Sequence, residues 1–294
     1  MNKISTSDIK KLRDLTGAGF LDCKNALDES NSDFDKAIEF LRKKGVSTAQ
    51  KKSDRSASEG LVAISSNELN KEAGIIEINS ETDFVARNEN FQSFVSNISK
   101  INLDQKGDLD KVIKSQYNKT KDKVSDVLTN LISKIGENLT IRRTDYINSD
   151  DGFVGTYVHN VEKDNMGKIG VLVSIKTDIE YSEVSDFLKK ICMHIAATNP
   201  IAITSSDLDK DTINKEKEFQ LDEIKKSNKD QSIQEKMLEG KMNKYFNEVV
   251  LLEQKFVVDD SIKINQFIEN TSKQLNGSIE IKQFIRFKVG EEYK

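Results

Sequence analysis

One ordered pattern of apolar spacing occurs twice in this chain, and it limits the fold more than any other sequence feature. In each occurrence, two short strand-like runs precede a stretch with apolar residues at helical spacing. The first set comprises the runs 61–64 and 74–78 and the helical stretch 91–98, and the second comprises the runs 153–161 and 169–175 and the helical stretch 184–195. This repetition predicts an α+β core of two related subdomains with antiparallel sheets, in which Gly74 corresponds to Gly170.

Further elements complete each predicted subdomain. A helical stretch over 124–135 is stopped by Gly136 and is followed by a strand over 139–143. The chain closes with a helix over 262–269 and a strand over 279–289. We therefore assign 55–145 to the first subdomain, and 146–205 together with 243–294 to the second.

Residues 1–54 are predicted to form a separate module of three short helices and a linker. Ser5 and Asp8 match the capping-box pattern that begins a helix, and Gly17 permits the backbone angles that end it. Leu15 continues the helical spacing of this first helix, so we expect it to face the core. Such a small bundle buries little surface, which predicts that it gains stability from a partner or a neighbouring domain.

The third helix of this module has its own start and stop signals. Asn31 or Ser32 is expected to cap it, and Gly45 is placed to end it. Residues 46–60 are small and polar, a composition typical of a linker.

Residues 206–242 interrupt the second predicted subdomain. They are very polar and compatible with helix, with few apolar positions. We predict a projecting antiparallel helical hairpin that turns near Ser227 and Asn228; the alternative is a charged, flexible insert.

Composition excludes several classes of function. His159, His194, Cys23 and Cys192 are the only histidines and cysteines, too few and too scattered for a histidine-built zinc site or a disulfide framework. A net charge of −4 argues against a dedicated nucleic-acid binder. The N-terminus lacks a signal-peptide apolar segment, and no apolar run approaches the roughly 20 residues that a membrane helix needs. We expect a reduced, cytoplasmic, non-enzymatic protein with no cofactor, no metal, no direct nucleic-acid contact and no membrane contact.

The conventional catalytic candidates have structural explanations. Thr16–Gly19 could cradle a phosphate, but it follows a helix and lacks the lysine of a P-loop, which favours a tight turn between helices. Cys23 and Cys192 lie at core spacing within predicted helices, and His194 is expected to pack or cap. A thiol enzyme that uses Cys23 stays open as an alternative.

One segment between a predicted strand and a predicted helix carries an unusual pair. Asp83 stands beside Phe84, flanked by Thr82 and Val85, where side chains project from a rigid edge. Asp83 could be a helix cap and Phe84 a core residue, which composition alone favours. Alternatively, the pair is an interaction wedge, with an aromatic anchor for a partner's pocket and an acid beside it.

Several motifs in order along the chain resemble the bacterial-type elongation factor Ts family. They are Leu12–Gly19 with Asp22–Lys24 and Ala26–Leu27, Glu59–Gly60, Glu81–Asn88, Ile135–Asn138 with Ile141–Arg143, Lys168–Val173, Met193–Ala197 with Pro200, Lys236–Met237, Glu239–Gly240, Leu252, and Phe284–Phe287 with Val289–Glu291. Each motif alone is weak, whereas the ordered set is highly specific.

The resemblance implies a guanine-nucleotide exchange factor that binds elongation factor Tu in its GDP-bound and nucleotide-free forms. It also implies that 1–54 is a ubiquitin-associated-like domain and that 206–242 is a coiled-coil insert, through which a homodimer or a 2:2 complex could form.

The resemblance further implies which residues meet the partner. Thr82, Asp83, Phe84 and Val85 would form a wedge that displaces the partner's magnesium ion. The N-terminal module would contact the partner through Arg13, Gly17, Gly19, Phe20 and Leu21, and Arg87 and His159 are further candidates.

Two questions stay open on sequence alone. The chain could be a protein-binding scaffold or chaperone-like adaptor without exchange activity, which uses the N-terminal module and the polar hairpin. Arg13, Arg87 and Arg286 could bind a partner or brace the fold.

Overall fold

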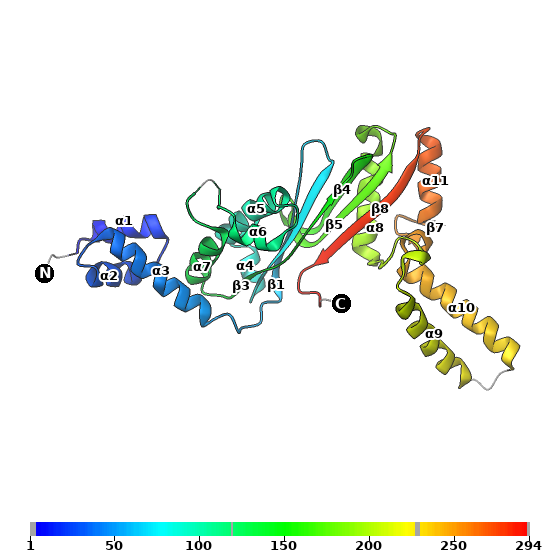
Figure 1. Ribbon diagram of the computed structural model, residues 1–294, viewed down its shortest axis with the longest axis horizontal. Helices are drawn as coiled ribbons and strands as arrows, with labels where there is room; N and C mark the ends of the chain where they lie inside the picture. Colours follow the sequence, from blue (N-terminus) through cyan, green and yellow to red (C-terminus); the bar gives the residue numbers. More distant parts are fainter. Residues whose placement is uncertain (1–3, 119, 227–229, 293–294) are drawn as a thin grey trace.

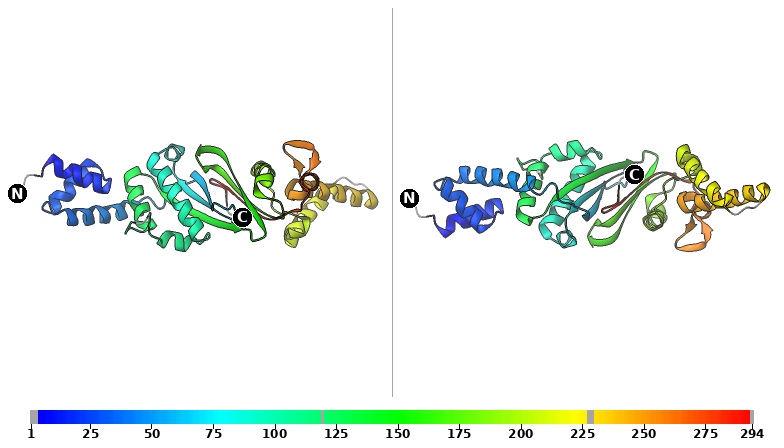
Figure 2. Two further views of the ribbon diagram at one scale, coloured as in Figure 1. Left: turned by 90° about the horizontal axis from the view of Figure 1, so that it is seen from above. Right: turned by 90° about the horizontal axis from the view of Figure 1, so that it is seen from below.

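The computed structural model describes residues 4–118, 120–226 and 230–292. These residues form an elongated molecule in which three N-terminal helices lie at one end, a twisted sheet occupies the middle and a helical pair projects at the other end (Figures 1 and 2). The predicted α+β class is confirmed, since helices pack on a sheet of antiparallel strands. Every helix within the described ranges is too short or too polar to cross a membrane.

The N-terminal end contains α1 (Thr6–Thr16), α2 (Phe20–Glu29) and α3 (Phe34–Gln50) around a small apolar core. Ser5 caps α1, because its Oγ accepts a hydrogen bond of 3.1 Å from the backbone N–H of Asp8, as predicted. Gly17 ends α1 in the left-handed region with φ 69°. Leu15, however, is 70% exposed, so its expected place in the core is wrong. It lies in the last turn of α1, just before the glycine that ends the helix.

The predicted ends of α3 are also wrong. Asp33 caps the helix by accepting from the Lys36 N–H, while Asn31 and Ser32 form the preceding turn with positive φ. Gly45 does not stop α3, which continues to Gln50. The glycine is buried inside the helix, and packing against a neighbouring helix outweighs its weak helix propensity.

Six strands form the central sheet, and their pairings are antiparallel. They are β1 (Glu59–Ser66), β2 (Glu72–Ser80), β3 (Leu139–Asn148), β4 (Gly152–Lys163), β5 (Met166–Thr177) and β8 (Ile279–Lys288). The two predicted hairpins are present as β1–β2 and β4–β5. In each half, a third strand returns beside the second strand of the hairpin: β3 beside β2, and β8 beside β5. A short pairing of β1 with β5 joins the halves.

The proposed equivalence of the two glycines is wrong, because they face opposite sides. A Cβ on Gly74 would lie 2.8 Å from Asn102 Nδ2, on the helix that covers β2. A Cβ on Gly170 would instead lie 2.6 Å from Val62 Cγ1, on the other half of the sheet. The repeat is therefore one of topology and not of residue position.

Three apolar layers hold the sheet. The outer face of the first half packs under α4 (Asp83–Ala86), α5 (Glu89–Asp104), α6 (Leu109–Lys114) and α7 (Val124–Ile135). The outer face of the second half packs under α8 (Tyr181–Thr198) and α11 (Ile264–Gln274). The inner faces share a third cluster that includes Val62, Ile75, Leu172 and Phe287. Because α7 ends at Gly136 with φ 84°, its predicted stop is confirmed.

The polar segment after α8 contains two helices, α9 (Lys210–Lys225) and α10 (Gln231–Val249), which lie side by side (Figure 1). An ion pair of 2.6 Å between Lys241 and Glu223 joins them. The predicted turn at Ser227 and Asn228 lies outside the described residues, and α10 continues past residue 242. Phe219 and Ile233 are exposed on this pair, and dimerisation through it stays a prediction.

A buried histidine fastens the base of this helical pair to the second half. His194 in α8 lies 2.9 Å from Gln254 Oε1 through its Nε2, and its Nδ1 accepts from the Val257 N–H. Gln254 and Val257 flank β6 (Lys255–Phe256), which pairs with β7 (Asp259–Lys263) in a small hairpin that sequence analysis missed. The expected structural role of His194 is confirmed by this burial and pairing.

Candidate functional site

Helix α4 presents Phe84 to solvent at the end of β2. The Phe84 side chain is 78% exposed, more than any other large apolar side chain in the described part of the chain. Asp83 beside it is exposed too, and the cap position of α4 belongs to Thr82. The alternative that places Phe84 in the core and makes Asp83 the cap is therefore wrong.

The base beneath Phe84 is rigid. Val85 and Ala86 are buried in the core under α4 and α5. The Gln92 side chain in α5 donates to the Ala86 carbonyl oxygen at 3.0 Å. One face of this single helical turn is thus fixed, and the other face carries the exposed pair.

Hydrogen bonds between residues 81–82 and residues 137–138, which we call the bracket, hold the start of α4 in place. Glu137, which directly follows the glycine that ends α7, accepts from the Thr82 N–H at 3.0 Å and from Thr82 Oγ1 at 2.7 Å. In return, the Asn138 N–H donates to Glu81 Oε1 at 2.6 Å. Thr82 makes no side-chain cap to its own helix, and its N–H and hydroxyl both donate to Glu137. Sequence analysis did not assign Glu137 to the site, although it lies within a quoted motif.

A second exposed apolar surface lies at the turn between α1 and α2. Phe20 and Leu21 are exposed there, as predicted for a contact surface, and Leu15 adds to them. Arg13 is exposed in α1, and Gly17 and Gly19 form the turn. A cavity of about 540 Å³ separates this turn from α7. We call Leu15, Phe20 and Leu21 the module surface; its binding role stays a prediction.

Arg87 follows α4 and His159 lies in β4, and an ion pair connects these two elements. Arg87, just after α4, lies 3.6 Å from Glu162 in β4. His159 is exposed in the same strand, with its Nδ1 3.1 Å from the Tyr157 hydroxyl. Strand β4 is an edge of the sheet, so its outer side has no partner strand within the described residues.

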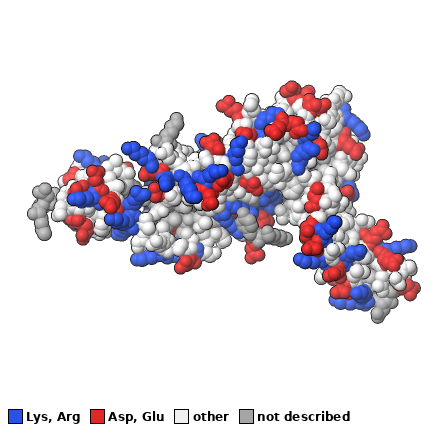
Figure 3. Space-filling view, viewed as in Figure 1, with Lys and Arg blue, Asp and Glu red and all other residues white. Residues whose placement is uncertain are grey.

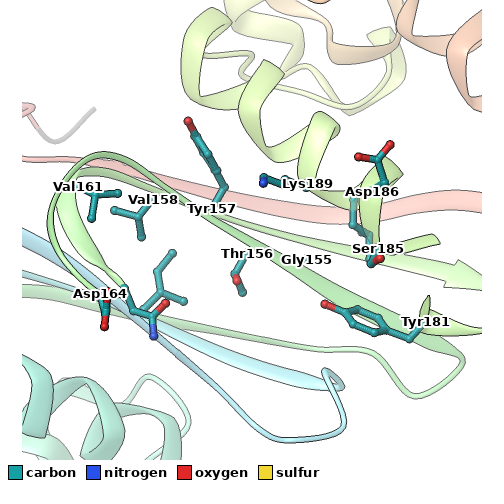
Figure 4. A pocket seen from close by; sticks show the side chains of 13 residues that line it. Gly155, Thr156, Tyr157, Val158, Val161, Asp164, Tyr181, Ser185, Asp186 and Lys189 are labelled. Atoms are coloured by element: carbon teal, nitrogen blue, oxygen red, sulfur yellow. The ribbon is translucent and has the colours of Figure 1, made fainter. Parts of the chain in front are cut away.

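A groove of about 800 Å³ opens between β4 and α8 (Figure 4). Gly155, Thr156 and Tyr157 line it from the strand, while Tyr181 and Lys189 line it from the helix. Gly155 allows this close approach, because a Cβ there would lie 2.8 Å from the Leu188 side chain. The groove contains both acidic and basic groups, and no set typical of acid–base catalysis.

Three arginines brace the fold. Glu77 in β2 is fully buried and lies 2.6 Å from Arg143 Nε and 3.3 Å from Arg142 Nη1. Arg286 pairs with Glu291 at 3.2 Å, and its side chain is almost fully buried. Arg286 therefore supports the structure, whereas Arg13 and Arg87 are exposed.

The cysteines are unsuited to nucleophilic chemistry. Cys23 is buried, and burial raises the pKa of its thiol above the ordinary value. Cys192 is buried among apolar side chains, which raises its thiol pKa further. A thiolate is the reactive form, so neither side chain provides an accessible nucleophile at neutral pH.

Charge on the surface does not favour one kind of ligand. Acidic and basic side chains are intermixed over the face seen in Figure 3. Within the described ranges, no group of three or more histidines, cysteines, aspartates or glutamates is arranged to hold a metal ion. The distinctive features are thus exposed apolar side chains on rigid supports, which suit protein recognition.

Comparisons with known proteins identify the family of this chain. The family described as Elongation factor TS matches residues 81–291. A protein of Bartonella henselae named Elongation factor Ts is 43% identical over 98% of this chain and 93% of its own length. Proteins with the same name from Rhodospirillum centenum and Mesorhizobium japonicum are 42% and 41% identical, over 99% and 98% of this chain and 94% and 93% of their own lengths. The chain therefore belongs to the elongation factor Ts family.

Proposed function

We propose that this chain is a guanine-nucleotide exchange factor that binds elongation factor Tu and promotes GDP release during translation elongation in the cytoplasm. Family membership supports the general activity. The observation that carries the finer proposal is Phe84, an aromatic side chain held in solvent on a braced helical turn beside Asp83. Exposure of this aromatic ring to water does not stabilise the fold. An exposed aromatic ring on a rigid support is typical of a side chain that anchors a protein interface.

The proposed mechanism needs no covalent chemistry. GDP is held in part by a magnesium ion that belongs to the partner, and this ion is the largest local charge near the phosphates. Insertion of Phe84 beside that site would displace the partner groups that hold the ion, and the Asp83 carboxylate would add an unfavourable charge near the phosphates. GDP would then dissociate faster because its charge is less well compensated.

Nucleotide exchange depends on the coupling free energy between binding of GDP and binding of this chain to the same partner. If the chain weakens GDP binding by some factor, GDP weakens binding of the chain by the same factor. The complex is therefore expected to be tight without nucleotide and transient with it. The module surface, Arg87 and His159 would supply contacts that bind both forms of the partner and so hold the wedge in place.

Release of a fluorescent GDP analogue from purified elongation factor Tu tests the proposal. The chain should accelerate release, and Phe84→Ala or Asp83→Ala should reduce the maximal acceleration. A hot-spot side chain contributes at least about 2 kcal/mol, and a loss of this size in the stabilisation of the transition state for GDP release corresponds to about thirtyfold in rate.

Leu69→Ala is the matched control, because Leu69 is 71% exposed in the turn between β1 and β2 and has no assigned contact. It should retain the wild-type rate. If the wild-type chain binds the partner without any effect on release, the protein-binding scaffold or adaptor is the better assignment.

A further inference from the structure

Helix α3 belongs to two hydrophobic cores at once. Its first half contributes Phe34, Ala37 and Leu41 to the core of the N-terminal helices. In its second half, Gly45 is buried against α7, and Ala49 packs on the core under α5 and α7. Seventeen residues of α-helix span about 25 Å. One continuous helix therefore links the N-terminal helices to the sheet domain (Figure 1).

Small side chains make the contact between α3 and α7. A Cβ on Gly45 would lie 3.8 Å from Asn130 Oδ1, 3.9 Å from Ser133 Cβ and 4.0 Å from Thr129 Cγ2. These are ordinary van der Waals distances, so alanine fits at this position. A branched side chain such as leucine is too long for the gap between Gly45 and Ser133 and has to turn toward the cavity that Gly45 lines, which changes how α3 packs on α7.

Polar contacts secure both ends of this junction. Near the start of α7, Arg42 lies 3.0 Å from Asp126. At its end, Lys52 Nζ donates to the Gly136 carbonyl oxygen. The second half of α3 therefore follows α7 along its length. These exposed contacts orient the helices more than they stabilise them.

Helix α7 leads directly into the bracket beneath Phe84. The residue that ends α7 is followed by Glu137, which accepts two hydrogen bonds from Thr82. A continuous set of packed elements thus runs from the module surface, through α3 and α7, to α4.

We infer that the α3–α7 junction fixes the span between the module surface and Phe84, with Gly45 as its positioning residue. The inference rests on the proposed function, because both surfaces are assigned to one partner. Once one surface has bound, a fixed span makes the second contact intramolecular, at a high effective concentration. A loosened junction weakens engagement of the partner and leaves the wedge itself unchanged.

A distance measurement on the full chain tests the rigidity without any partner. Spin labels are placed on Lys10→Cys in α1 and Lys100→Cys in α5, both at exposed positions, while the native cysteines are buried. The distance distribution should be narrow in the otherwise wild-type chain and with Gly45→Ala, and broad with Gly45→Leu. Circular dichroism should give the same helix content for all three. A narrow distribution in all three chains overturns the inference.

The release assay tests the consequence for function. Gly45→Leu should raise the concentration of chain that gives half-maximal GDP release by at least about tenfold and keep the maximal rate. Phe84→Ala should instead lower the maximal rate, and Gly45→Ala should match wild type. An unchanged half-maximal concentration for a Gly45→Leu chain with a broad distance distribution overturns the positioning role. If the wild-type chain releases no GDP, the proposed function fails, while the distance measurement still decides whether the junction is rigid.

Discussion

At the scale of single residues, the account depends on where large side chains are kept out of the core. Phe84 is exposed while its neighbours Val85 and Ala86 are buried, so one turn of helix has a buried supporting face and an exposed face. Leu15 and Leu21 are each 70% exposed near the turn between α1 and α2. Exposed apolar side chains of this size that gather at one turn are typical of a protein-binding surface, and that role stays a prediction for the module surface.

Glu137 should matter for exchange because it holds Thr82 at the start of α4. Glu137→Ala removes both hydrogen bonds from Thr82, each to a charged acceptor of the kind that contributes about 1.5–3 kcal/mol before solvent exposure is discounted. The start of α4 should loosen, so the Thr82 amide should lose protection in hydrogen exchange, and the maximal rate of GDP release should fall.

Two further variants make this test specific. Glu137→Gln can still accept one hydrogen bond from Thr82 and should retain most of the activity. Glu89→Ala removes an exposed acid at the start of α5 and should have no effect on either readout. Unchanged Thr82 protection in Glu137→Ala would show that the bracket does not hold α4.

At the scale of elements, local signals predicted most helices and strands, and long-range packing decided the exceptions. The hairpins and the end of α7 follow from alternation and from Gly136, which act within a few residues. The continuation of α3 through Gly45 depends on α7, which lies some 80 residues further along the chain, and no local pattern contains that contact. The sequence also identified Asp83 and Phe84 as a pair, but only the fold decided between core and surface.

The attachment of the helical pair to α8 should depend on pH. Burial lowers the pKa of His194 below its ordinary value near 6.5, so the folded chain favours the neutral ring. The unfolded chain then binds more protons as the pH falls below 6.5, and folding loses stability in that direction. Between pH 7 and 5.5 this one group should lower the free energy of unfolding by at most about 1.3 kcal/mol.

Urea unfolding at both pH values, in wild type and His194→Gln, measures this contribution. The variant should be less stable at pH 7, because a buried ring is lost, and less sensitive to pH. His159→Gln is the control for loss of a histidine side chain that is exposed and not part of the core. Equal pH dependence in wild type and His194→Gln would refute the assignment.

At the scale of the whole molecule, the elongated shape separates several surfaces that one partner could meet together. The N-terminal helices and the α9–α10 pair lie at opposite ends, with α4 between them on the sheet domain (Figure 1). In the proposed function, GDP and this chain each weaken the binding of the other to one partner. The free energy of this coupling can be measured at equilibrium.

The most direct test is a complete binding cycle with purified elongation factor Tu. Calorimetry gives the affinity of the chain for the nucleotide-free and GDP-bound partner, and the affinity of GDP for the partner with and without the chain. We predict that the chain binds the nucleotide-free partner more tightly than the GDP-bound partner. The ratio of these two affinities should equal the factor by which the chain lowers the affinity of the partner for GDP. Phe84→Ala should reduce both ratios by the same factor. Equal affinity for the two forms, or ratios that Phe84→Ala leaves unchanged, would contradict these predictions.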